Sequence, residues 1–368
     1  MKICLFSPYI PDHLGGGEKF LLDAALALSA SNSVYVAVAQ AHPLSNEQVA
    51  SLKKKYQDFL GKSLEKVTFI ATPLWTTASF LTRLLWTRQF DVLFFATDGS
   101  LFFSLAKRNI LHIQIPFTMP KRSLIERLKL ANWQVKSANS QFTQKIVAKS
   151  WNCKIPYVHY PQIDTQVLAV PDKHIKREKI ILHVGRFFTH QHSKRQDILI
   201  DIFRKFQQSN IAFADWKLVF IGSVEDATYF QQVQDKASDL PIEFYTKIDR
   251  REVLDWYRRA SIYWHATGYS VDEVAHPEKV EHFGISTVEA MAAGCVPLVY
   301  AAGGQQEILA NELAYCLWKS IDECVQKTQE LVSDDTMYSN LQEHAIARSQ
   351  DFGQNQFYVT LQKMVCND

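Results

Sequence analysis

The 368-residue sequence lacks several features that define whole classes of protein. No uncharged apolar stretch approaches the roughly 20 residues of a membrane-spanning helix, so any membrane contact is expected to be peripheral. None of the six cysteines belongs to a Cys-x-x-Cys pair, and a chain of this length does not need a disulfide framework. We therefore predict reduced thiols in a cytoplasmic protein.

Motifs for dinucleotides, for P-loop phosphates and for metals are also missing. The triplet Gly15-Gly16-Gly17 does not continue as Gly-x-Gly-x-x-Gly, because Phe20 follows, and no Gly-x-x-x-x-Gly-Lys-Ser/Thr occurs. The sequence contains no Asp-x-Asp pair. Six histidines that could suggest a metal site lack zinc-ligand spacing: His183, His190, His192, His265, His276 and His282. We therefore expect no metal and no cofactor.

The net charge is small overall but unevenly distributed. The chain holds 40 Lys and Arg residues against 38 Asp and Glu residues, a net charge of +2. Residues 1–150 contain 18 basic and 9 acidic side chains, a net of +9, whereas residues 151–368 contain 22 and 29, a net of −7. The first half is therefore expected to face something anionic.

Short apolar runs alternate with helical periods along the whole chain, which is typical of βαβ units around parallel sheets. In the first half we expect a helix at 18–28 and strands at 3–6, 34–39, 67–70, 92–95, 110–113, 135–138 and 157–160. In the second half we expect a helix at 197–206 and strands at 180–184, 218–221, 242–245, 262–265, 296–300 and 315–318. Residues 161–178 break the rhythm. The pattern predicts two doubly wound α/β domains joined by a linker there.

Two short motifs fit a phosphate ligand. Gly15–Gly17 opens a helix after the first strand, where backbone N–H groups can approach a phosphate, although a mere tight turn has the same sequence. Gly185 and Arg186 end a strand, and Lys194 precedes the next helix. One guanidinium and one ammonium there can neutralise a diphosphate, and the alternative is a solvated basic loop.

The most specific motif lies at 281–294. It places Glu281 before a glycine turn and Glu289 eight residues later, in the first turns of a helix that ends in Ala-Met-Ala-Ala-Gly. The N–H groups around Gly284–Thr287 would face a ligand phosphate. One carboxylate can bind a ribose diol, and another can hold sugar hydroxyls. A second glycine turn, Gly303-Gly304, falls on the same edge of the expected sheet.

In combination these motifs resemble the retaining GT-B glycosyltransferases of family 4, whose signature is two glutamates separated by seven residues. The resemblance covers most of the chain and includes, in the family's order, Gly15–Glu18, Ala138–Thr143, Tyr160–Asp164, Val184–Arg186, Lys194, Glu281–Gly294 and Ala302–Glu307. It implies an α/β fold of the GT-B class: two Rossmann-like domains with parallel sheets facing a central cleft. The implied domains are an acceptor-binding domain at 1–165 and a nucleotide-sugar-binding domain at 176–345. A final helix within 346–368 would cross back to the first domain.

The resemblance also implies roles for individual residues. Arg186 and Lys194 would neutralise the donor diphosphate without a metal, Glu289 would bind the ribose, and Glu281 would hold the transferred sugar. Arg186, Lys194 and Glu281 are thus the implied catalytic residues. The implied donor-binding set is Gly16, Gly17, Arg186, Lys194, His282, Phe283, Gly284, Ile285, Ser286, Thr287 and Glu289. The donor would be UDP- or GDP-linked, and the acceptor a glycan or lipid-linked glycan in polysaccharide or lipopolysaccharide biosynthesis.

One position departs from the family pattern. Many relatives carry a His just before Pro in the strand that ends the acceptor pocket, and here the matching residue is Gln114. Glutamine cannot act as a base, although it can bond a sugar hydroxyl. His112, two residues earlier, shares a strand face with Gln114. Both residues are acceptor-side candidates, and His112 can equally be a hydrogen-bonded core histidine.

Two segments of the basic half raise the question of a membrane. Residues 121–136 hold Glu126 and five basic side chains, and residues 75–86 form a strongly apolar stretch; the basic residues are Lys121, Arg122, Arg127, Lys129 and Lys136. They fit either a peripheral contact with an anionic membrane that carries a lipid-linked acceptor, or a solvated basic face over an ordinary core helix. No stacking pattern for nucleic acid accompanies the charge.

Two other functions are compatible with the expected fold. A sugar-nucleotide epimerase or hydrolase could use it, and so could a catalytically silent protein that binds nucleotide sugars. The presence of Arg186, Lys194 and Glu289 weighs against a silent protein, and Gln114 is the one feature in its favour.

Overall fold

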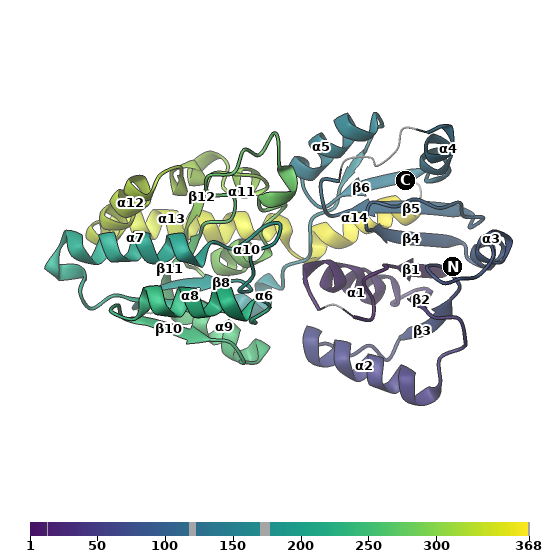
Figure 1. Cartoon of the computed structure of the whole chain (residues 1–368), viewed down its shortest axis with the longest axis horizontal. Helices are drawn as coiled ribbons and strands as arrows, with labels where there is room; N and C mark the ends of the chain where they lie inside the picture. Colours follow the sequence, from purple (N-terminus) through teal and green to yellow (C-terminus); the bar gives the residue numbers. More distant parts are fainter. Residues whose placement is uncertain (13, 118–122, 170–176, 367–368) are drawn as a thin grey trace. The chain divides into compact units, whose positions relative to one another are not determined.

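The computed structural model describes residues 1–12, 14–117, 123–169 and 177–366, and it divides the chain into two compact units. Unit 1 comprises Met1–Gln162 together with Asn355–Asp368, and unit 2 comprises Ile163–Gln354. Each unit contains one parallel sheet flanked by helices (Figure 1). The observed class is therefore α/β with two parallel sheets.

The sheet of unit 1 has seven strands in the order β3-β2-β1-β4-β5-β6-β7. Their bounds are β1 Lys2–Phe6, β2 Ser33–Ala39, β3 Val67–Thr72, β4 Val92–Thr97, β5 Arg108–Ile113, β6 Val135–Ala138 and β7 Tyr157–Val158. All neighbours pair in parallel, and β1 lies between β2 and β4. Strand order reverses between β1 and β4, so this is the switch point of a doubly wound sheet, where ligands bind at the carboxyl ends of the strands.

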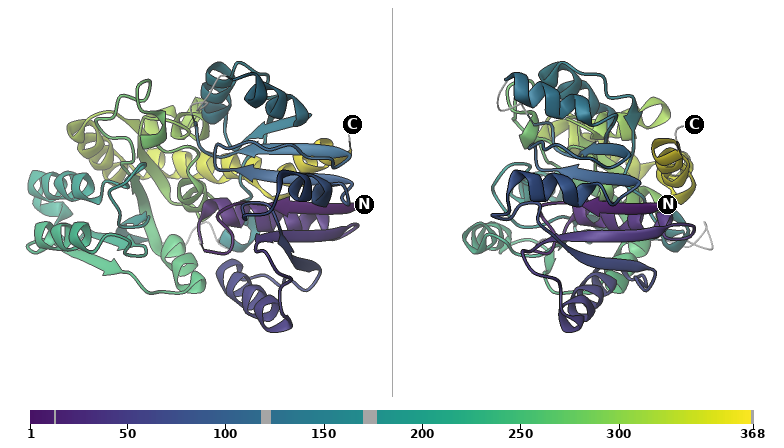
Figure 2. Two further views of the ribbon diagram at one scale, coloured as in Figure 1. Left: turned by 45° about the vertical axis from the view of Figure 1, so that its right-hand side comes forward. Right: turned by 90° about the vertical axis from the view of Figure 1, so that its right-hand side faces the viewer.

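Helices cover both faces of this sheet. They are α1 Gly16–Leu28, α2 Asn46–Leu60, α3 Phe80–Thr87, α4 Leu124–Asn132, α5 Gln141–Trp151 and α14 Gln354–Cys366. One core contains the inner sides of α1, α2 and α14, and the other contains α4 and α5, with Trp86 of α3 packed against it. Figure 2 shows the C-terminal helix lying along one side of this sheet.

Unit 2 repeats the same strand order with six strands, β10-β9-β8-β11-β12-β13. The bounds are β8 Glu178–Val184, β9 Lys217–Ile221, β10 Ile242–Tyr245, β11 Ala260–His265, β12 Val296–Tyr300 and β13 Leu317–Trp318. Its α-helices are α6 Thr165–Leu168, α7 Gln196–Ser209, α8 Ala227–Ala237, α9 Arg250–Arg259, α10 Ile285–Ala292, α11 Gln305–Ile308, α12 Ile321–Ser333 and α13 Asp335–Ser349. Short 3-10 turns lie at η1 Ile211–Phe213, η2 Pro277–Lys279, η3 Asn311–Cys316 and η4 Gln350–Phe352. Helix α7 packs beside α8 and α12, and α10 packs beside α13.

Every strand expected from the sequence is present, most with small shifts of its ends. The predicted linker at 161–178 is only partly irregular, because Thr165–Leu168 forms α6 and Glu178 opens β8; residues 170–176 lie outside the described residues. The predicted boundary at 345/346 falls inside α13, and the chain passes to unit 1 only at Asn355. Along the described parts of the chain, no helix combines the length and the apolar character needed to cross a bilayer.

Candidate functional site

The candidate site lies at the switch point of the unit 2 sheet. Strands β8 and β11 are neighbours there, and the chain continues from them toward opposite sides of the sheet. Gly185 and Arg186 follow β8 directly, and His265 is the last residue of β11. Parallel strands bring their carboxyl ends to one edge, so these residues meet where a doubly wound sheet binds its ligand.

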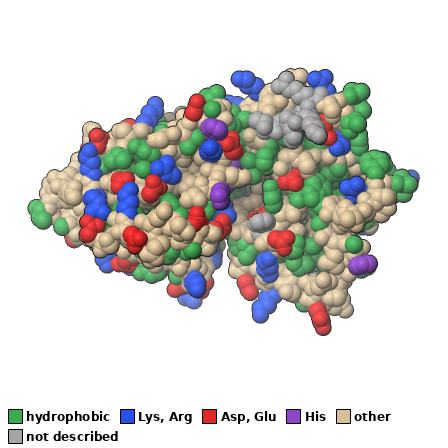
Figure 3. All heavy atoms as spheres, in the orientation of Figure 1, with side chains coloured by type: hydrophobic (Ala, Val, Ile, Leu, Met, Phe, Trp, Pro, Cys, Tyr) green, Lys and Arg blue, Asp and Glu red, His purple; other side chains and the backbone are tan. Residues whose placement is uncertain are grey.

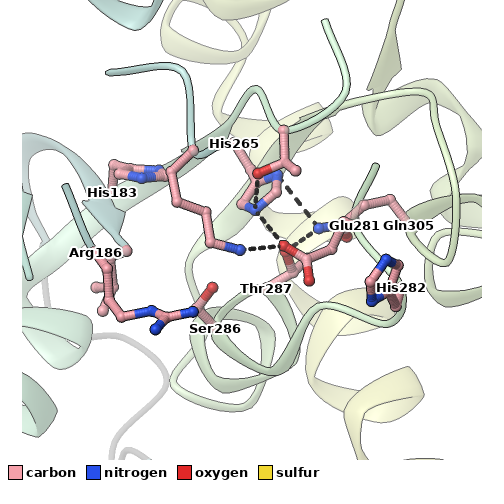
Figure 4. Close-up of polar contacts among 12 residues, drawn as sticks. His183, Arg186, His265, Glu281, His282, Ser286, Thr287 and Gln305 are labelled. Atoms are coloured by element: carbon pink, nitrogen blue, oxygen red, sulfur yellow. Dashed lines mark hydrogen bonds and ion pairs between the residues drawn. The ribbon is translucent and has the colours of Figure 1, made fainter. Parts of the chain in front are cut away.

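A buried cluster of three titratable side chains occupies this edge (Figure 4). The Lys194 ammonium lies 2.5 Å from Oε2 of Glu281, and Nε2 of His265 lies 3.1 Å from the same oxygen. The Lys194 and Glu281 side chains are each only 12% exposed, and His265 is fully buried. One carboxylate oxygen thus accepts two hydrogen bonds in a place that water barely reaches.

The orientation of His265 is set by its other contacts. The amide Nε2 of Gln305 lies 3.4 Å from Nδ1 of His265 and donates to Oγ1 of Thr287 at 2.9 Å. An amide N–H next to Nδ1 makes that nitrogen the acceptor, so Nε2 carries the proton and donates to Glu281. The hydroxyl of Thr267 lies 3.3 Å from Nε2. This network fixes the imidazole in one tautomer facing the carboxylate.

The cluster keeps Glu281 ionised and its histidine neutral. Burial alone would raise the pKa of Glu281, but the charge of Lys194 and the hydrogen bond from His265 hold it well below its usual range. Burial lowers the pKa of His265, and the Glu281 carboxylate offsets only part of that shift. Burial likewise lowers the pKa of His183 to about 3 and that of His282 to about 4. Near neutral pH the one negative group here is therefore the Glu281 carboxylate.

Glycines bring the backbone close around Glu281. Gly284 is the N-cap of α10 at φ 123°, a left-handed conformation that side-chain-bearing residues rarely adopt. A Cβ on Gly303 would lie 2.2 Å from the carbonyl oxygen of Glu281, and one on Gly304 2.4 Å from that of His282. The Gly304 N–H donates to the Glu281 carbonyl at 2.8 Å. The glycine turn after β12 thus supports the loop that presents Glu281 and the N-terminus of α10.

Arg186 lies at the same strand end but has its own partners. Its Nη1 is 2.9 Å from Oε1 of Glu225, and its guanidinium lies over the Phe188 ring, 4.7 Å from the centroid. The Arg186 side chain is 39% exposed. Figure 4 also draws Ser286 of the same site, whose hydroxyl bonds the Tyr263 hydroxyl at 2.7 Å. The two predicted diphosphate cations are thus each paired with a carboxylate, Arg186 at the surface and Lys194 in the interior.

Glu289, the second glutamate of the motif, is in a buried ion pair on the second turn of α10. Arg250 at the start of α9 contacts both of its oxygens, and the Tyr257 hydroxyl donates to Oε2 at 3.1 Å. The charge of Glu289 raises the pKa of Arg250. The Glu289 side chain is only 6% exposed. Its carboxylate is thus held in place by two groups that the sequence motif does not contain.

The predicted groups of unit 1 lie at its own strand ends. Helix α1 begins at Gly16, as a phosphate-binding glycine turn requires, and a Cβ on Gly17 would lie 2.6 Å from Oε1 of Gln114. The Nε2 atom of Gln114 is buried and has no hydrogen-bond partner. His112 is fully buried, stacks on Phe20 at 3.9 Å between ring centroids, and bonds Oγ of Ser137 at 2.9 Å. Burial holds its pKa well below the usual value.

Three of the remaining predicted histidines have local polar partners, whereas the buried Nδ1 of His192 has no hydrogen-bond partner among the described residues. Nδ1 of His183 donates to the Trp264 carbonyl at 2.9 Å, Nε2 of His282 lies 3.3 Å from the Glu278 carbonyl, and His276 lies 3.3 Å from the Glu278 carboxylate. Among the described residues, no three His, Cys, Asp or Glu side chains are grouped so that they could hold a metal ion. A pocket of about 330 Å³ lies beside α7 and α8, lined by Thr189, Ser193, Arg195, Asp197, Tyr229, Gln232, Val233 and Lys236. It does not include Glu281.

Sequence reasoning missed three residues that shape the site. It considered His265 only as a metal ligand, although its place at the end of a central strand would have marked it as a neighbour of Glu281. Arg250 and Tyr257 carried no such signal, because their approach to Glu289 depends on how α9 packs beside α10.

Residues 169–348, which contain all of these unit 2 side chains, match the family model described as Glycosyl transferases group 1. This segment therefore resembles the glycosyltransferases of group 1. Two curated relatives carry the name GDP-Man:Man(3)GlcNAc(2)-PP-Dol alpha-1,2-mannosyltransferase. The Neurospora crassa protein is 29% identical over 157 residues, which is 40% of this chain and 26% of that protein. The Dictyostelium discoideum protein is 24% identical over 234 residues, 60% of this chain and 44% of that protein. The chain therefore spans less than half the length of these relatives.

Solved structures similar to this chain agree on its fold. The Anabaena protein HepE, crystallised with UDP, superposes with a TM-score of 0.71 at 16% identity, covering 100% of this chain and 99% of that one. A glycosyltransferase from Rickettsia africae gives a TM-score of 0.72 at 13% identity with the same coverage. At these identities the likeness concerns the fold, which is GT-B.

Proposed function

We propose that this protein is a retaining, metal-independent glycosyltransferase of family 4 that transfers a sugar from a UDP- or GDP-linked donor to a glycan or lipid-linked acceptor. The observation that carries the proposal is the buried contact of Lys194 and His265 with Glu281 at the switch point of unit 2. Desolvating an ion pair is costly, and such pairs at strand ends concentrate at functional sites. The match of this segment to the group 1 family supports the assignment.

In this proposal the donor diphosphate competes with carboxylates for two cations. Without a donor, Lys194 is paired with Glu281 and Arg186 with Glu225. A diphosphate carries more charge than one carboxylate and can draw both cations toward it. Once Lys194 turns to the phosphate, the Glu281 carboxylate can accept hydrogen bonds from sugar hydroxyls. The N–H of His265 keeps that carboxylate ionised and oriented.

The same groups would act in the chemical step. When the bond between the anomeric carbon and the diphosphate breaks, negative charge develops on the leaving group. Arg186, Lys194 and the N-terminus of α10 would stabilise this charge. The acceptor hydroxyl would attack from the side of the leaving group, so the anomeric configuration is retained. His282, Phe283 and the helix-opening residues Gly284–Thr287 would supply backbone N–H groups to the donor.

Glu289 is proposed to bind the ribose. An ionised carboxylate has about four acceptor positions, and Arg250 and Tyr257 use three of them. One position remains for a ribose hydroxyl. In this role the two missed residues fix the carboxylate before the nucleotide arrives, which lowers the entropy lost on binding.

The acceptor side is proposed for unit 1. Gln114 and His112 each have a buried Nε2 atom without a hydrogen-bond partner. Gln114 fits the acceptor role better, because the His112 ring is fully buried and stacked on Phe20. The two curated relatives are named for a lipid-linked glycan acceptor, which supports such an acceptor here, and the UDP bound by the similar protein HepE supports UDP as one donor nucleotide. Action at the cytoplasmic side of a membrane, in polysaccharide or lipopolysaccharide assembly, is part of the proposal. All six cysteines are free thiols, in keeping with a reducing compartment.

A donor screen tests this function. Purified protein is mixed with UDP-, GDP- and ADP-sugars, and thermal shift and nucleotide release are measured with and without glycan acceptors and with a chelator present. We expect one donor class to shift the melting temperature and to release nucleotide with acceptor, with chelator harmless and the product's anomeric configuration retained. Release without transfer would indicate a hydrolase, and binding without release a silent protein. Loss of transfer with chelator, restored by Mg²⁺ or Mn²⁺, would contradict metal independence.

A further inference from the structure

Unit 1 exposes large apolar side chains on helices α3 and α4 and on the loop between β4 and β5, which contacts both helices. Helix α3 buries only Thr87 and helix α4 only Leu130, so neither is the ordinary core helix that an apolar sequence would suggest. Among the described residues, seven of the sixteen exposed large hydrophobic side chains lie here: Phe80, Leu81, Leu85, Leu105, Leu124, Ile125 and Leu128. We call this set the α3–α4 face. Leu124 is 72% exposed and Leu81 60%.

Contacts within unit 1 join these side chains into one surface. The Phe80 ring packs edge-on against Phe103, with 6.3 Å between centroids. The Leu105 N–H donates to Thr87 at the end of α3, and the Ser104 N–H donates to Asn132 at the end of α4, each at 2.8 Å. The loop therefore connects the two helices. Figure 3 shows hydrophobic side chains gathered at the end of the molecule where Figure 1 places α3 and α4.

The charges available on this face are cationic. The exposed side chains of Arg88 and Arg127 have no carboxylate partner within the described part of the chain. The nearby acids are already engaged: Glu126 pairs with Lys129 at 2.7 Å and Asp91 pairs with Lys107 at 2.6 Å. An occupant of the face must therefore accept apolar side chains and guanidinium groups together.

An anionic lipid surface meets both requirements. A second copy of this chain would bring the same arginines together across a two-fold contact, which like charges oppose. A nucleic acid would use stacking rings rather than leucines. We propose that the α3–α4 face attaches unit 1 to an anionic bilayer, with the apolar side chains entering the headgroup boundary and Arg88 and Arg127 pairing with lipid phosphates.

This inference deepens the proposed function, whose acceptor is lipid-linked, and it changes the expected mode of attachment. The sequence suggested attraction through the basic residues of 121–136. Lys121 and Arg122 lie outside the described residues, Lys129 is paired with Glu126, and Lys136 bonds the Trp133 carbonyl at 2.6 Å. Apolar insertion is therefore the main contribution, and salt should weaken binding only in part.

Vesicle flotation with matched variants tests the surface. The probes are vesicles of pure phosphatidylcholine and of phosphatidylcholine with phosphatidylglycerol, at low and high salt. The test variant is L81E/L124E. The control is I211E/V274E, which introduces the same two charges at apolar residues of unit 2 that are 88% and 85% exposed. A third variant, R88E/R127E, removes the cations alone.

We expect wild type and control to float with the anionic vesicles and to keep measurable binding at high salt. L81E/L124E should bind at least about 30-fold more weakly at both salt concentrations. R88E/R127E should bind the anionic vesicles about 30-fold more weakly than wild type at low salt, because each basic group near an anionic surface adds a screened attraction. At high salt its affinity should differ little from that of wild type. Melting temperatures should be alike in all variants, because all of the substituted side chains are exposed.

Three results would overturn the proposal. Wild type could ignore anionic vesicles at low salt, or test and control variants could lose binding equally. Light scattering could also show a wild-type dimer that L81E/L124E converts to a monomer, which would assign the face to a second copy. Failure here is distinguishable from failure of the proposed function, because nucleotide-induced thermal shift and transfer to a soluble acceptor are measured on the same variants without vesicles.

Discussion

The two units arrange their strands in the same order around a switch point, yet the two switch points hold different chemistry. In unit 2 the strand ends carry Lys194, His265 and Glu281 in direct contact. In unit 1 the equivalent edge carries glycines at the start of α1 and the neutral amide of Gln114. The comparison teaches that strand order decides where a ligand binds, whereas the side chains at the strand ends decide which ligand it is.

The largest expected effect is a loss of kcat that should differ between two glutamates, one at each switch point. Glu281→Gln should lower kcat by about 10²–10³-fold, since it removes a charge that acts on the sugar. The affinity for free nucleoside diphosphate should be kept or raised, because the diphosphate no longer competes with a carboxylate for Lys194. Glu18→Gln, at the buried first turn of α1 in unit 1, should lower kcat less than about 10-fold. Steady-state kinetics and nucleotide titration measure both. Equal losses in kcat would break the comparison between the units.

The free energy of unfolding of unit 2 should fall more steeply with decreasing pH than that of unit 1. Burial lowers the pKa of four histidines in unit 2 and two in unit 1; they are His183, His192, His265 and His282, and His112 and His159. Because the folded pKa lies below the unfolded value of about 6.5, the unfolded state binds more protons. The free energy of unfolding therefore keeps its full value above pH 6.5. Below that pH it decreases by up to about 1.4 kcal/mol per pH unit for each histidine.

Hydrogen exchange at pH 7.0, 6.0 and 5.0, resolved by peptide, measures this difference between the units. We expect protection in β8 and β11 to fall roughly twice as steeply with acid as protection in β1 and β5. His183→Asn, which removes one titrating group of unit 2, should make the two dependences more alike. Parallel pH dependences in wild type would contradict the assignment of the buried neutral histidines.

A third effect concerns the nucleotide. Glu289→Gln should weaken nucleoside diphosphate binding by roughly 10- to 150-fold, because a hydrogen bond to a charged group contributes about 1.5–3 kcal/mol. Gln114→Ala in unit 1 should leave that affinity unchanged and raise the KM for the acceptor. Calorimetric titration with UDP and GDP, at a temperature where both variants are folded, distinguishes them. A loss of nucleotide affinity in the Gln114 variant would move part of the donor site to unit 1.

The smallest expected effect is a loss of stability that should differ between substitutions at two glycines. A Cβ at Gly304 would meet the backbone oxygen of His282, which cannot move without the loop, so Gly304→Ala should cost about 1–3 kcal/mol of stability. A Cβ at Gly17 would meet only the end of the Gln114 side chain, which can turn away. Gly17→Ala should therefore cost less than about 1 kcal/mol and act mainly on the acceptor KM. Urea unfolding measures both changes.

Much of the fold could be predicted because the strands are short apolar runs with polar ends. Residues 135–138, 242–245 and 296–300 form strands with the predicted bounds. The four-residue helix α6 was missed because one helical turn has too few residues to show a period. Trp75 was placed in an apolar helix, but it has φ 57° and lies before α3.

The candidate site was predictable in its motif and not in its contacts. Lys194 and Glu281 were both identified, yet no spacing rule shows that an ammonium 87 positions away pairs with a carboxylate. The same holds for Arg250 and Glu289, whose contact depends on the packing of α9 beside α10. The sequence also left the exposure of residues 75–86 open, since they fitted either a membrane contact or a core helix; in the structure Phe80, Leu81 and Leu85 of α3 are exposed.

The last helix of the chain completes the first unit. Helix α14 supplies Phe357, Leu361, Met364 and Val365 to a core that otherwise consists of residues before 158. On the ribosome, the N-terminal sheet therefore emerges first with one apolar face covered only by α1 and α2. The part of that face that α14 covers stays open until this helix has left the exit tunnel. Unit 2 is synthesised in between and can fold earlier. Unit 1 is thus synthesised first but completes its fold last. Its unfinished sheet is the part of the nascent chain that chaperones would need to protect.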